Sequence, residues 1–211
     1  MKVVYIPAKV KHAGIAELMQ KVQIPGTFAI VTTIQFLDEV NQLKGYQVLG
    51  QILGCNTVQT RHADIEAFLY IGTGKFHPLN LAFTGGKPVY TLDPMTKEFS
   101  RITEEEVQHY EKRKKGMLLK YYAAEKIGII VSTKSGQNLL PRALRFQEKC
   151  GKKAYIFMCN NVQKLEDFQD IDCWVNTACV RIIEDDLGVP MVNIRDVETK
   201  PTETPVYQAS F

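Results

Sequence analysis

The sequence predicts an α/β protein of two similar doubly wound three-layer α/β/α lobes, with mainly parallel sheets, joined by a long helix. Short apolar runs without polar alternation, such as residues 67–71 and 127–133, are typical of parallel strands covered on both faces. Helical segments alternate with these runs, which favours doubly wound units. We therefore assign residues 1–100 to a first lobe and residues 101–211, a linker helix plus a second set of strands, to a second lobe.

The first lobe reads as alternating strands and helices that end at the turn signal Asp93-Pro94. Strands are expected at residues 2–7, 27–32, 46–53, 67–71 and 88–92, and helices near residues 13–22 and 36–43.

A capping box opens the linker helix, because Thr103 is followed by Glu106 in the S/T-x-x-E pattern. The helix is expected to run to about residue 126. Acidic residues lie in its first turn and the basic run 112–115 lies further along, an order that suits the helix dipole. The basic run is either an anion site or a solvated helix face.

The second lobe follows the same plan. Strands are expected at residues 127–133, 154–158 and 173–176, with a helix near residues 139–149 that ends at Gly151. The segment from Thr199 contains two prolines and little apolar content, so we expect it to fray or to dock on a partner.

Composition and charge exclude several classes of protein. The chain has 211 residues, 26 basic and 23 acidic, and its net charge of +3 is too balanced to indicate a nucleic-acid partner. No stretch approaches the ~18 consecutive apolar residues of a membrane span, and no signal-peptide pattern is present. We expect a cytoplasmic protein with no nucleic-acid and no membrane partner.

Cysteines are the first candidates for chemistry. In a reducing cytoplasm they are expected to be unpaired, and no CxxC pair is present. Cys55 and Cys179 each close a predicted strand and open a loop, at the sheet edge where ligands and metals bind. Cys159 also ends a strand and is a further candidate there. Cys150 and Cys173 are expected to be buried thiols.

Two loops after predicted strands are also candidate sites. In the first, Gly72, Thr73 and Gly74 precede His77, and closely spaced glycines let backbone N–H groups approach an anion. The spacing fits neither a P-loop nor a dinucleotide fingerprint, so a plain tight turn is the alternative. In the second, residues 132–137 include Ser132 and Gln137, which either hold a polar ligand or complete a satisfied turn.

Two weaker candidates remain. His62 has no visible partner in the sequence and is expected at the surface. The acidic run 184–186 either binds a divalent cation or marks the start of a helix.

Four motifs together resemble the diphthamide synthesis enzyme family, the 2-(3-amino-3-carboxypropyl)histidine synthases of archaea and eukaryotes. The motifs are GQILGCN at residues 50–56, GTGKFHP at 72–78, IVSTKSGQ at 130–137 and VNTACVR at 175–181. Four motifs in the right order are more specific than any one of them, and they span nearly the whole chain.

The resemblance implies three α/β domains that each give one cysteine to a [4Fe–4S] cluster. It also implies a transferase that moves a 3-amino-3-carboxypropyl group from S-adenosylmethionine to a histidine of translation elongation factor two by radical chemistry. On this resemblance Cys55 and Cys179 match two cluster ligands, with Cys159 a possible third. The residues expected at the S-adenosylmethionine site are Gly72, Thr73, Gly74, His77, Ser132, Gln137 and Arg181.

The sequence also departs from the family. The family's first domain has no counterpart before Met1, and Val180 stands where the family usually has proline. The missing ligand comes from a separate chain, from an identical copy or from Cys159. We therefore expect elongation factor two, an electron donor protein and a homodimeric or heterodimeric partner that supplies the missing domain.

Three functions follow from this reading. The first is a transferase that is complete only with a partner. The second is a non-catalytic scaffold or electron-relay subunit of such an enzyme, motivated by Val180 and by the missing cysteine. The third is a general ligand-binding α/β protein with an empty cluster site.

Overall fold

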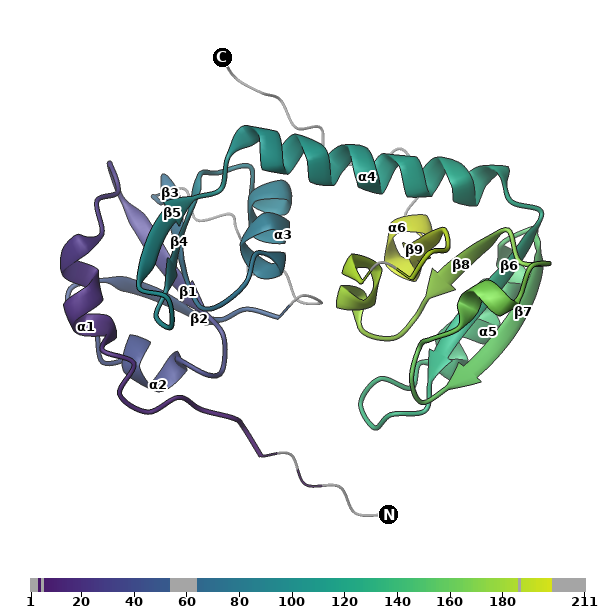
Figure 1. Ribbon diagram of the computed structural model, residues 1–211, viewed down its shortest axis with the longest axis horizontal. Coiled ribbons are helices and arrows are strands. Elements are labelled where there is room, and N and C mark those ends of the chain that lie inside the picture. Colours follow the sequence, from purple (N-terminus) through teal and green to yellow (C-terminus); the bar gives the residue numbers. More distant parts are fainter. Residues whose placement is uncertain (1–3, 5, 54–63, 186, 199–211) are drawn as a thin grey trace. The chain divides into compact units, whose positions relative to one another are not determined.

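The computed structural model describes residues 4, 6–53, 64–185 and 187–198 (Figure 1). Its contacts divide the chain into two compact units, Met1–Tyr110 and Glu111–Phe211. The helix α4 (Glu104–Ala123) contains the boundary between them. Each unit has its own mainly parallel sheet, as predicted from the sequence, whereas the expected boundary at residues 100 and 101 stays a prediction.

Five strands form the sheet of the first unit, in the order β2-β1-β3-β4-β5. Strands β1 to β4 are parallel, and β5 returns antiparallel to β4. The turn between these last two strands is built on Asp93, whose carboxylate accepts hydrogen bonds from the N–H groups of Met95 and Thr96. The strands are β1 (Phe28–Thr32), β2 (Gln47–Gln51), β3 (Ala67–Ile71), β4 (Val89–Asp93) and β5 (Glu98–Arg101).

Helices cover both faces of this sheet. The short helices α1 (Ile15–Leu18) and α2 (Leu37–Val40) pack on the face that carries Ile30 and Leu69. A 3-10 helix, η1 (Met19–Lys21), extends α1. On the other face, α3 (Phe76–Gly85) packs Leu81 against a cluster that includes Val31, Phe68 and Tyr70. The alternating strand residues therefore serve two cores, which explains why the strands read as continuous apolar runs.

The second unit repeats this strand order. Its four strands are all parallel and lie in the order β7-β6-β8-β9. Counted within each unit, the order in both sheets is second, first, third, fourth. The direction of winding reverses between the first and third strands, which defines a topological switch point in each unit. The strands are β6 (Lys126–Ser132), β7 (Lys153–Cys159), β8 (Cys173–Asn176) and β9 (Met191–Asn193).

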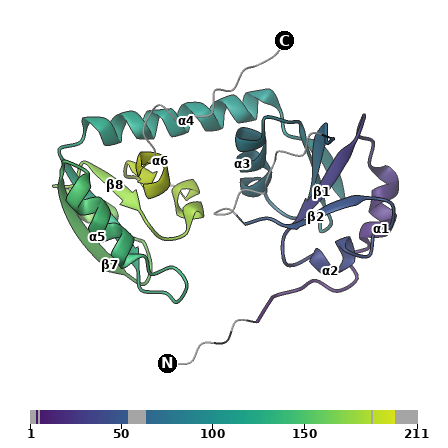
Figure 2. The ribbon, with the colours of Figure 1, turned by 180° about the vertical axis from the view of Figure 1, so that it is seen from behind.

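The two faces of the second sheet are covered differently. The helices α5 (Leu140–Lys149) and α6 (Ile194–Glu198) pack with the end of α4 on the face of Ile129 and Val175, and Figure 2 shows α5 lying over the sheet. On the other face, residues from the 3-10 helices η2 (Leu165–Asp167) and η3 (Val180–Glu184) pack around Trp174.

The ends of α4 are closed by side chains. The predicted capping box is confirmed, because the Thr103 hydroxyl accepts a hydrogen bond from the N–H of Glu106 and the Glu106 carboxylate accepts one from the N–H of Thr103. At the other end, the Lys152 ammonium donates to the carbonyls of Tyr122 and Ala124, at 3.0 and 2.6 Å. A basic side chain there satisfies carbonyls that the helix itself leaves unpaired.

Several sequence-based expectations differ from the structure. The strand expected at residues 2–7 is wrong for the described residues, since Val4 and Ile6 lie outside any strand with 76% and 86% of their surface exposed. Glu184 ends η3 rather than opening a helix. The elements that were not anticipated are α3, β5, β9, α6 and the 3-10 helices η2 and η3. In the described part of the chain, none of the helices combines the length and the apolar character needed to cross a lipid bilayer.

Candidate functional site

Apart from Cys159, which ends β7, the predicted site residues that the structure describes lie at the carboxyl ends of the first and third strands of their own units. In the first unit, residues 72–77 follow β3. In the second unit, Ser132 ends β6 and Gln137 follows it, while Cys179 and Arg181 follow β8. Strands β1 and β3, like β6 and β8, are neighbours. Each set therefore lies at a switch point, where open α/β sheets bind their ligands.

The Gly72 loop is shaped by the buried side chain of Tyr70. The phenol donates a hydrogen bond to the carbonyl of Thr73 at 3.1 Å, and burial raises its pKa, so it remains a neutral donor. A Cβ on Gly72 would come within 2.6 Å of the phenol oxygen. Gly74 has a φ of +74°, which favours glycine. Both glycines therefore have local reasons for being there.

The rest of this loop begins α3. His77 is half-buried in the first turn, with its ring 6.1 Å from the ring of Tyr70. Lys75, the N-cap residue, forms an ion pair with Glu106. This hydrogen bond lowers the pKa of the Glu106 carboxyl, with help from the N–H of Thr103. Lys75 is therefore engaged on α4, and Thr73 and Gly74 remain as the exposed part of the loop.

The Cys179 loop is fixed by the carboxamide of Asn176, which is 1% exposed. Its nitrogen donates to the carbonyl of Cys179 and to Oδ1 of Asn193, both at 2.9 Å. Its oxygen accepts from the N–H of Ala178 at 2.9 Å. Cys179 is itself exposed and occupies the N-cap position of η3. The thiol thus projects from a loop whose backbone is held by a buried side chain.

Buried threonine hydroxyls tie the first and third strands together in both units. The hydroxyl of Thr177 donates to the carbonyl of Ile130 at 2.7 Å, and its N–H donates to the same oxygen at 3.1 Å. In the first unit, the Thr32 hydroxyl donates to the carbonyl of Ile71 at 2.7 Å. These bonds close the sheet at the switch point and support the loops that follow.

Ser132 and Gln137 belong to a turn that satisfies its own backbone. Ser132 is buried, and its hydroxyl accepts a hydrogen bond from the N–H of Lys134 at 3.1 Å. The N–H of Gln137 donates to the carbonyl of Lys134 at 3.1 Å. The satisfied turn of the sequence analysis is therefore present, and a ligand role for the half-buried Gln137 stays a prediction.

The remaining described cysteines differ from Cys179. Cys159 is half-buried beside the cluster that contains Trp174, and burial raises the pKa of its thiol, an effect that Lys134 partly offsets. Cys159 is the last residue of β7, which lies on the side of β6 away from β8. Cys150 ends α5, and Cys173 is fully buried, which raises its pKa to about 12. The buried-thiol prediction is confirmed for Cys173, and half-buried Cys150 is partly shielded.

The candidate metal-binding residues that the structure describes are spread over the second unit. Within the described ranges, no three His, Cys, Asp or Glu side chains form a group that could hold a metal ion. Cys55 and His62 lie outside the described residues, as does Asp186 of the acidic run. Cys179 fits an iron–sulfur cluster by its chemistry, because it is a thiol that is exposed and held on a fixed loop.

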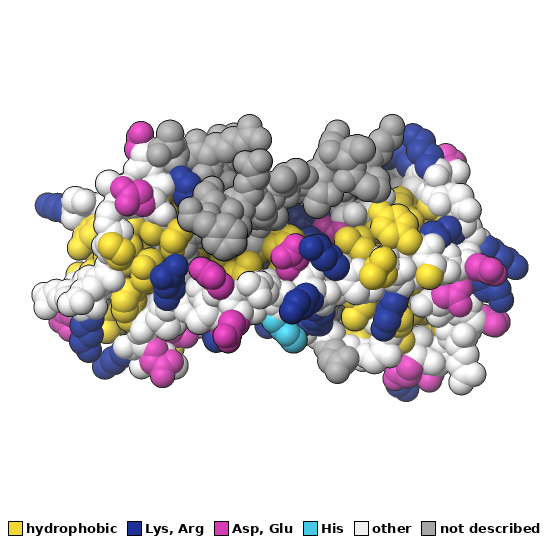
Figure 3. All heavy atoms as spheres, turned by 90° about the horizontal axis from the view of Figure 1, so that it is seen from above, with side chains coloured by type: hydrophobic (Ala, Val, Ile, Leu, Met, Phe, Trp, Pro, Cys, Tyr) yellow, Lys and Arg dark blue, Asp and Glu magenta, His cyan; other side chains and the backbone are white. Residues whose placement is uncertain are grey.

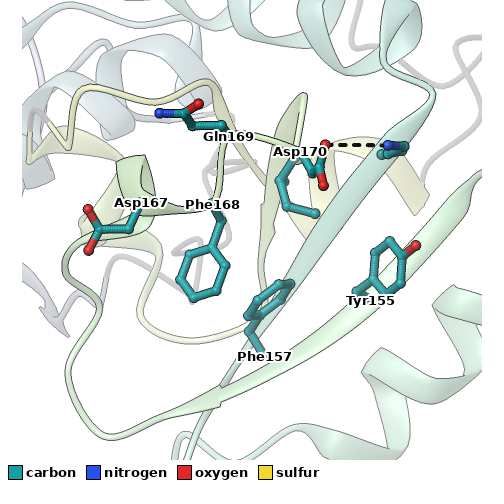
Figure 4. A pocket seen from close by; sticks show the side chains of 8 residues that line it. Tyr155, Phe157, Asp167, Phe168, Gln169 and Asp170 are labelled. Atoms are coloured by element: carbon teal, nitrogen blue, oxygen red, sulfur yellow. Dashed lines mark ion pairs between the residues drawn. The ribbon is translucent and has the colours of Figure 1, made fainter.

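A pocket in the second unit was not anticipated from the sequence (Figure 4). It lies near the amino ends of β6 and β8 and contains none of the predicted site residues. Asp170 forms an ion pair with Lys126 at 3.6 Å, and the rings of Phe157 and Phe168 meet edge to face at 4.9 Å. The lining residues are Lys126, Tyr155, Phe157, Asp167, Phe168, Gln169, Asp170 and Ile171.

Comparison with known proteins gives one consistent result. The sequence model of the diphthamide synthesis protein family matches residues 1–200. A 2-(3-amino-3-carboxypropyl)histidine synthase from Pyrococcus horikoshii is 30% identical over 224 residues, covering 92% of this chain and 64% of that enzyme. The enzyme of the same name from Methanocaldococcus jannaschii is 32% identical over 163 residues, covering 75% of this chain and 46% of that enzyme.

Solved structures agree with the sequence comparisons. The crystal structure of Dph2 from Pyrococcus horikoshii with a 4Fe-4S cluster matches with a TM-score of 0.68 and 30% identity. The match covers 90% of this chain and 61% of that one. The chain thus spans less than two thirds of these relatives. The family model and the archaeal relatives cover nearly all of it, and the chain belongs to the diphthamide synthesis protein family.

Proposed function

We propose that this chain takes part in diphthamide biosynthesis as part of a 2-(3-amino-3-carboxypropyl)histidine synthase. The reaction would transfer a 3-amino-3-carboxypropyl group from S-adenosylmethionine to a histidine of translation elongation factor two, in the cytoplasm. Family membership and the names of the relatives support this proposal. The observation that carries it is the exposed Cys179 on a loop fixed by Asn176, within the VNTACVR motif.

Cys55 and Cys179 are the proposed thiolate ligands of a [4Fe–4S] cluster. When bound, the cluster supplies the electron that starts radical chemistry, and an electron donor protein replenishes it. A further domain or chain provides the third ligand, in a homodimer or heterodimer, because the matching relatives are longer than this chain. Cys159 is the weaker candidate, since it is half-buried with a raised pKa.

The polar residues at the two switch points are the proposed S-adenosylmethionine site. In the first unit, the exposed Thr73 and Gly74 offer backbone donors at the start of α3, next to His77. In the second unit, the exposed guanidinium of Arg181 and the carboxamide of Gln137 suit the carboxylate of the methionine end. Gly72 and Ser132 have supporting roles: Gly72 leaves room for the phenol of Tyr70, and the hydroxyl of Ser132 accepts a hydrogen bond from the N–H of Lys134.

Iron and acid-labile sulfide per chain after anaerobic reconstitution test the cluster ligands. Together with the chain that supplies the third ligand, the wild type is expected to hold about four irons, the content of one [4Fe–4S] cluster, and Cys55→Ala or Cys179→Ala is expected to lose most of this iron. Cys150→Ala is the matched control, because that half-buried thiol bonds to the carbonyl of Gln147. Iron retained in both ligand variants would contradict the assignment, and loss in Cys159→Ala would identify the third ligand.

Equilibrium binding of S-adenosylmethionine tests the pocket. Arg181→Ala and Gln137→Ala are each expected to weaken binding about tenfold or more, because each removes a donor to a carboxylate. Arg145→Ala removes an exposed guanidinium from α5 and serves as the control. Unchanged affinity in both pocket variants would exclude this site.

A specific observation supports the alternative of a non-catalytic scaffold or electron-relay subunit. Val180, the first residue of η3, stands where the family usually has proline. A second subunit is consistent with fungal relatives, such as that from Yarrowia lipolytica, which is named subunit 1 of its synthase. Transferase assays of an active relative, with and without this chain, distinguish the two functions. A scaffold is expected to raise the relative's activity even when this chain carries Cys179→Ala.

A further inference from the structure

Side chains of the basic run 112–115 in α4 form ion pairs with carboxylates rather than a wholly solvated face. Arg113 donates to the carbonyl of Ile183 at 2.6 Å and pairs with the carboxylate of Glu184 at 3.2 Å. Lys114 pairs with Asp196 at 2.9 Å. Figure 3, which views the face that carries α4, shows basic side chains lying among acidic ones.

Arg113 holds the carboxyl end of η3. The last carbonyls of a helix lack partners within the helix, and Ile183 and Glu184 are the last two residues of η3. A guanidinium can bond to a carbonyl and a carboxylate at once, because its donors form a planar fork. The pair is partly shielded, since 37% of the Arg113 side chain and 26% of the Glu184 side chain are exposed.

The amino end of η3 is Cys179, which Asn176 holds from β8. Backbone bonds also flank η3: the N–H of Ile182 donates to the carbonyl of Cys179 at 3.1 Å, and the N–H of Asp185 donates to the carbonyl of Ile182 at 3.2 Å. Short 3-10 helices have poor internal hydrogen-bond geometry, so contacts from outside determine how well they are fixed. Asn176 and Arg113 therefore bond to the two ends of η3, in addition to the packing of Ile182 and Ile183 around Trp174.

We propose that Arg113 is a positioning residue for Cys179: it anchors η3 from α4 and so fixes the place from which the thiol is presented. The value of this for cluster binding rests on the function proposed above, whereas the anchoring itself does not. Arg113 touches no proposed ligand, and its effect passes through Ile183 and Glu184 to the N-cap residue.

Hydrogen exchange in the iron-free chain tests the anchoring directly. In Arg113→Gln, backbone amides of residues 178–185 are expected to exchange about fivefold faster, because a bond to a charged donor is lost. Lys115→Gln is the matched control, since it removes one charge from the same helix and its ammonium pairs with Glu111 within α4. Equal exchange in Arg113→Gln and Lys115→Gln would overturn the proposal. Amides of β6 report whether the whole unit has loosened, and they are expected to match the wild type.

The conservative variant and the rate of iron loss complete the test. Arg113→Lys keeps the charge opposite Glu184 but lacks the fork, so it is expected to restore part of the protection. In reconstituted protein, Arg113→Gln is expected to lose iron to a chelator severalfold faster than Lys115→Gln. Faster exchange with unchanged iron loss would overturn the link to the cluster. A wild type that binds no iron in the presence of the chain that supplies the third ligand would contradict the proposed function, while the exchange result would still decide the anchoring.

Discussion

The indole of Trp174 lies against the backbone of Gly128, so that a Cβ on residue 128 would come within 2.5 Å of the ring. Gly128 lies in β6, and Trp174 is its neighbour in β8. The largest buried side chain of the second unit therefore depends on the absence of a side chain in the adjacent strand.

Gly128→Ala is expected to destabilise the second unit by about 1–3 kcal/mol, the usual cost of overpacking a core. Trp174 is the single tryptophan, so its fluorescence during urea unfolding reports on this unit. Gly116→Ala is the matched control. Nothing lies within 4 Å of a Cβ at that position in α4, and the change is expected to stabilise by about 0.5–1 kcal/mol. Equal stability of the two variants would contradict the packing argument.

Asn176→Ala is expected to destabilise the second unit by about 2–3 kcal/mol, because it leaves a buried loop without its donor and acceptor. The same urea titration measures this. Asn138→Ala, which removes a more exposed carboxamide that accepts from the N–H of Leu140, is expected to cost about 1 kcal/mol or less. A larger loss in Asn138→Ala than in Asn176→Ala would refute the structural role assigned to Asn176.

Glu106→Gln is expected to destabilise the first unit by about 0.5–1 kcal/mol at pH 7, since the pair with Lys75 is largely solvated. The pKa of Glu106 is lowered on folding, so its stabilisation is complete above the unfolded carboxyl pKa of about 4.3 and is lost as pH falls through the folded value. The difference between wild type and variant should therefore vanish near pH 2. Glu105→Gln, at an exposed position one residue earlier, is the matched control measured over the same pH range.

Tyr70→Phe is expected to loosen the Gly72 loop, because the carbonyl of Thr73 loses its buried donor. The stability cost is about 1 kcal/mol. Hydrogen exchange of residues 72–76 is the measurement, with Tyr122→Phe, whose ring is 52% exposed, as the control. Unchanged exchange in Tyr70→Phe would show that the loop is fixed by other contacts.

Much of the fold could be predicted because its signals are local. Apolar runs such as Ala67–Ile71 mark the strands, and the Thr103 and Glu106 pair marks the start of α4. In contrast, α3 was not predicted because Pro78 in its first turn is more typical of a loop. Strand β5 was not predicted because it has only four residues, most of them polar, and forms by pairing with β4.

The candidate site divides in the same way. The placement of Cys179 and Ser132 at strand ends follows from sequence pattern, and the structure bears it out. The contacts that fix these loops do not follow from pattern, since Asn176 bonds to a residue 17 positions away and Arg113 to one 70 positions away. Such pairs become visible only when the whole sheet has been assembled.

The position along the chain of the residues that contact α4 determines when this helix gains its tertiary contacts during synthesis. Bonding partners of the later turns of α4 are synthesised after the helix itself. Lys152 bonds to the carbonyls of Tyr122 and Ala124, Ile183 accepts from Arg113, and Asp196 pairs with Lys114. A ribosome that has made the chain only to the end of α4 thus exposes a helix whose later turns still lack these anchors. The carboxyl-terminal half of α4 is therefore made early and stabilised late, together with the loop that carries Cys179.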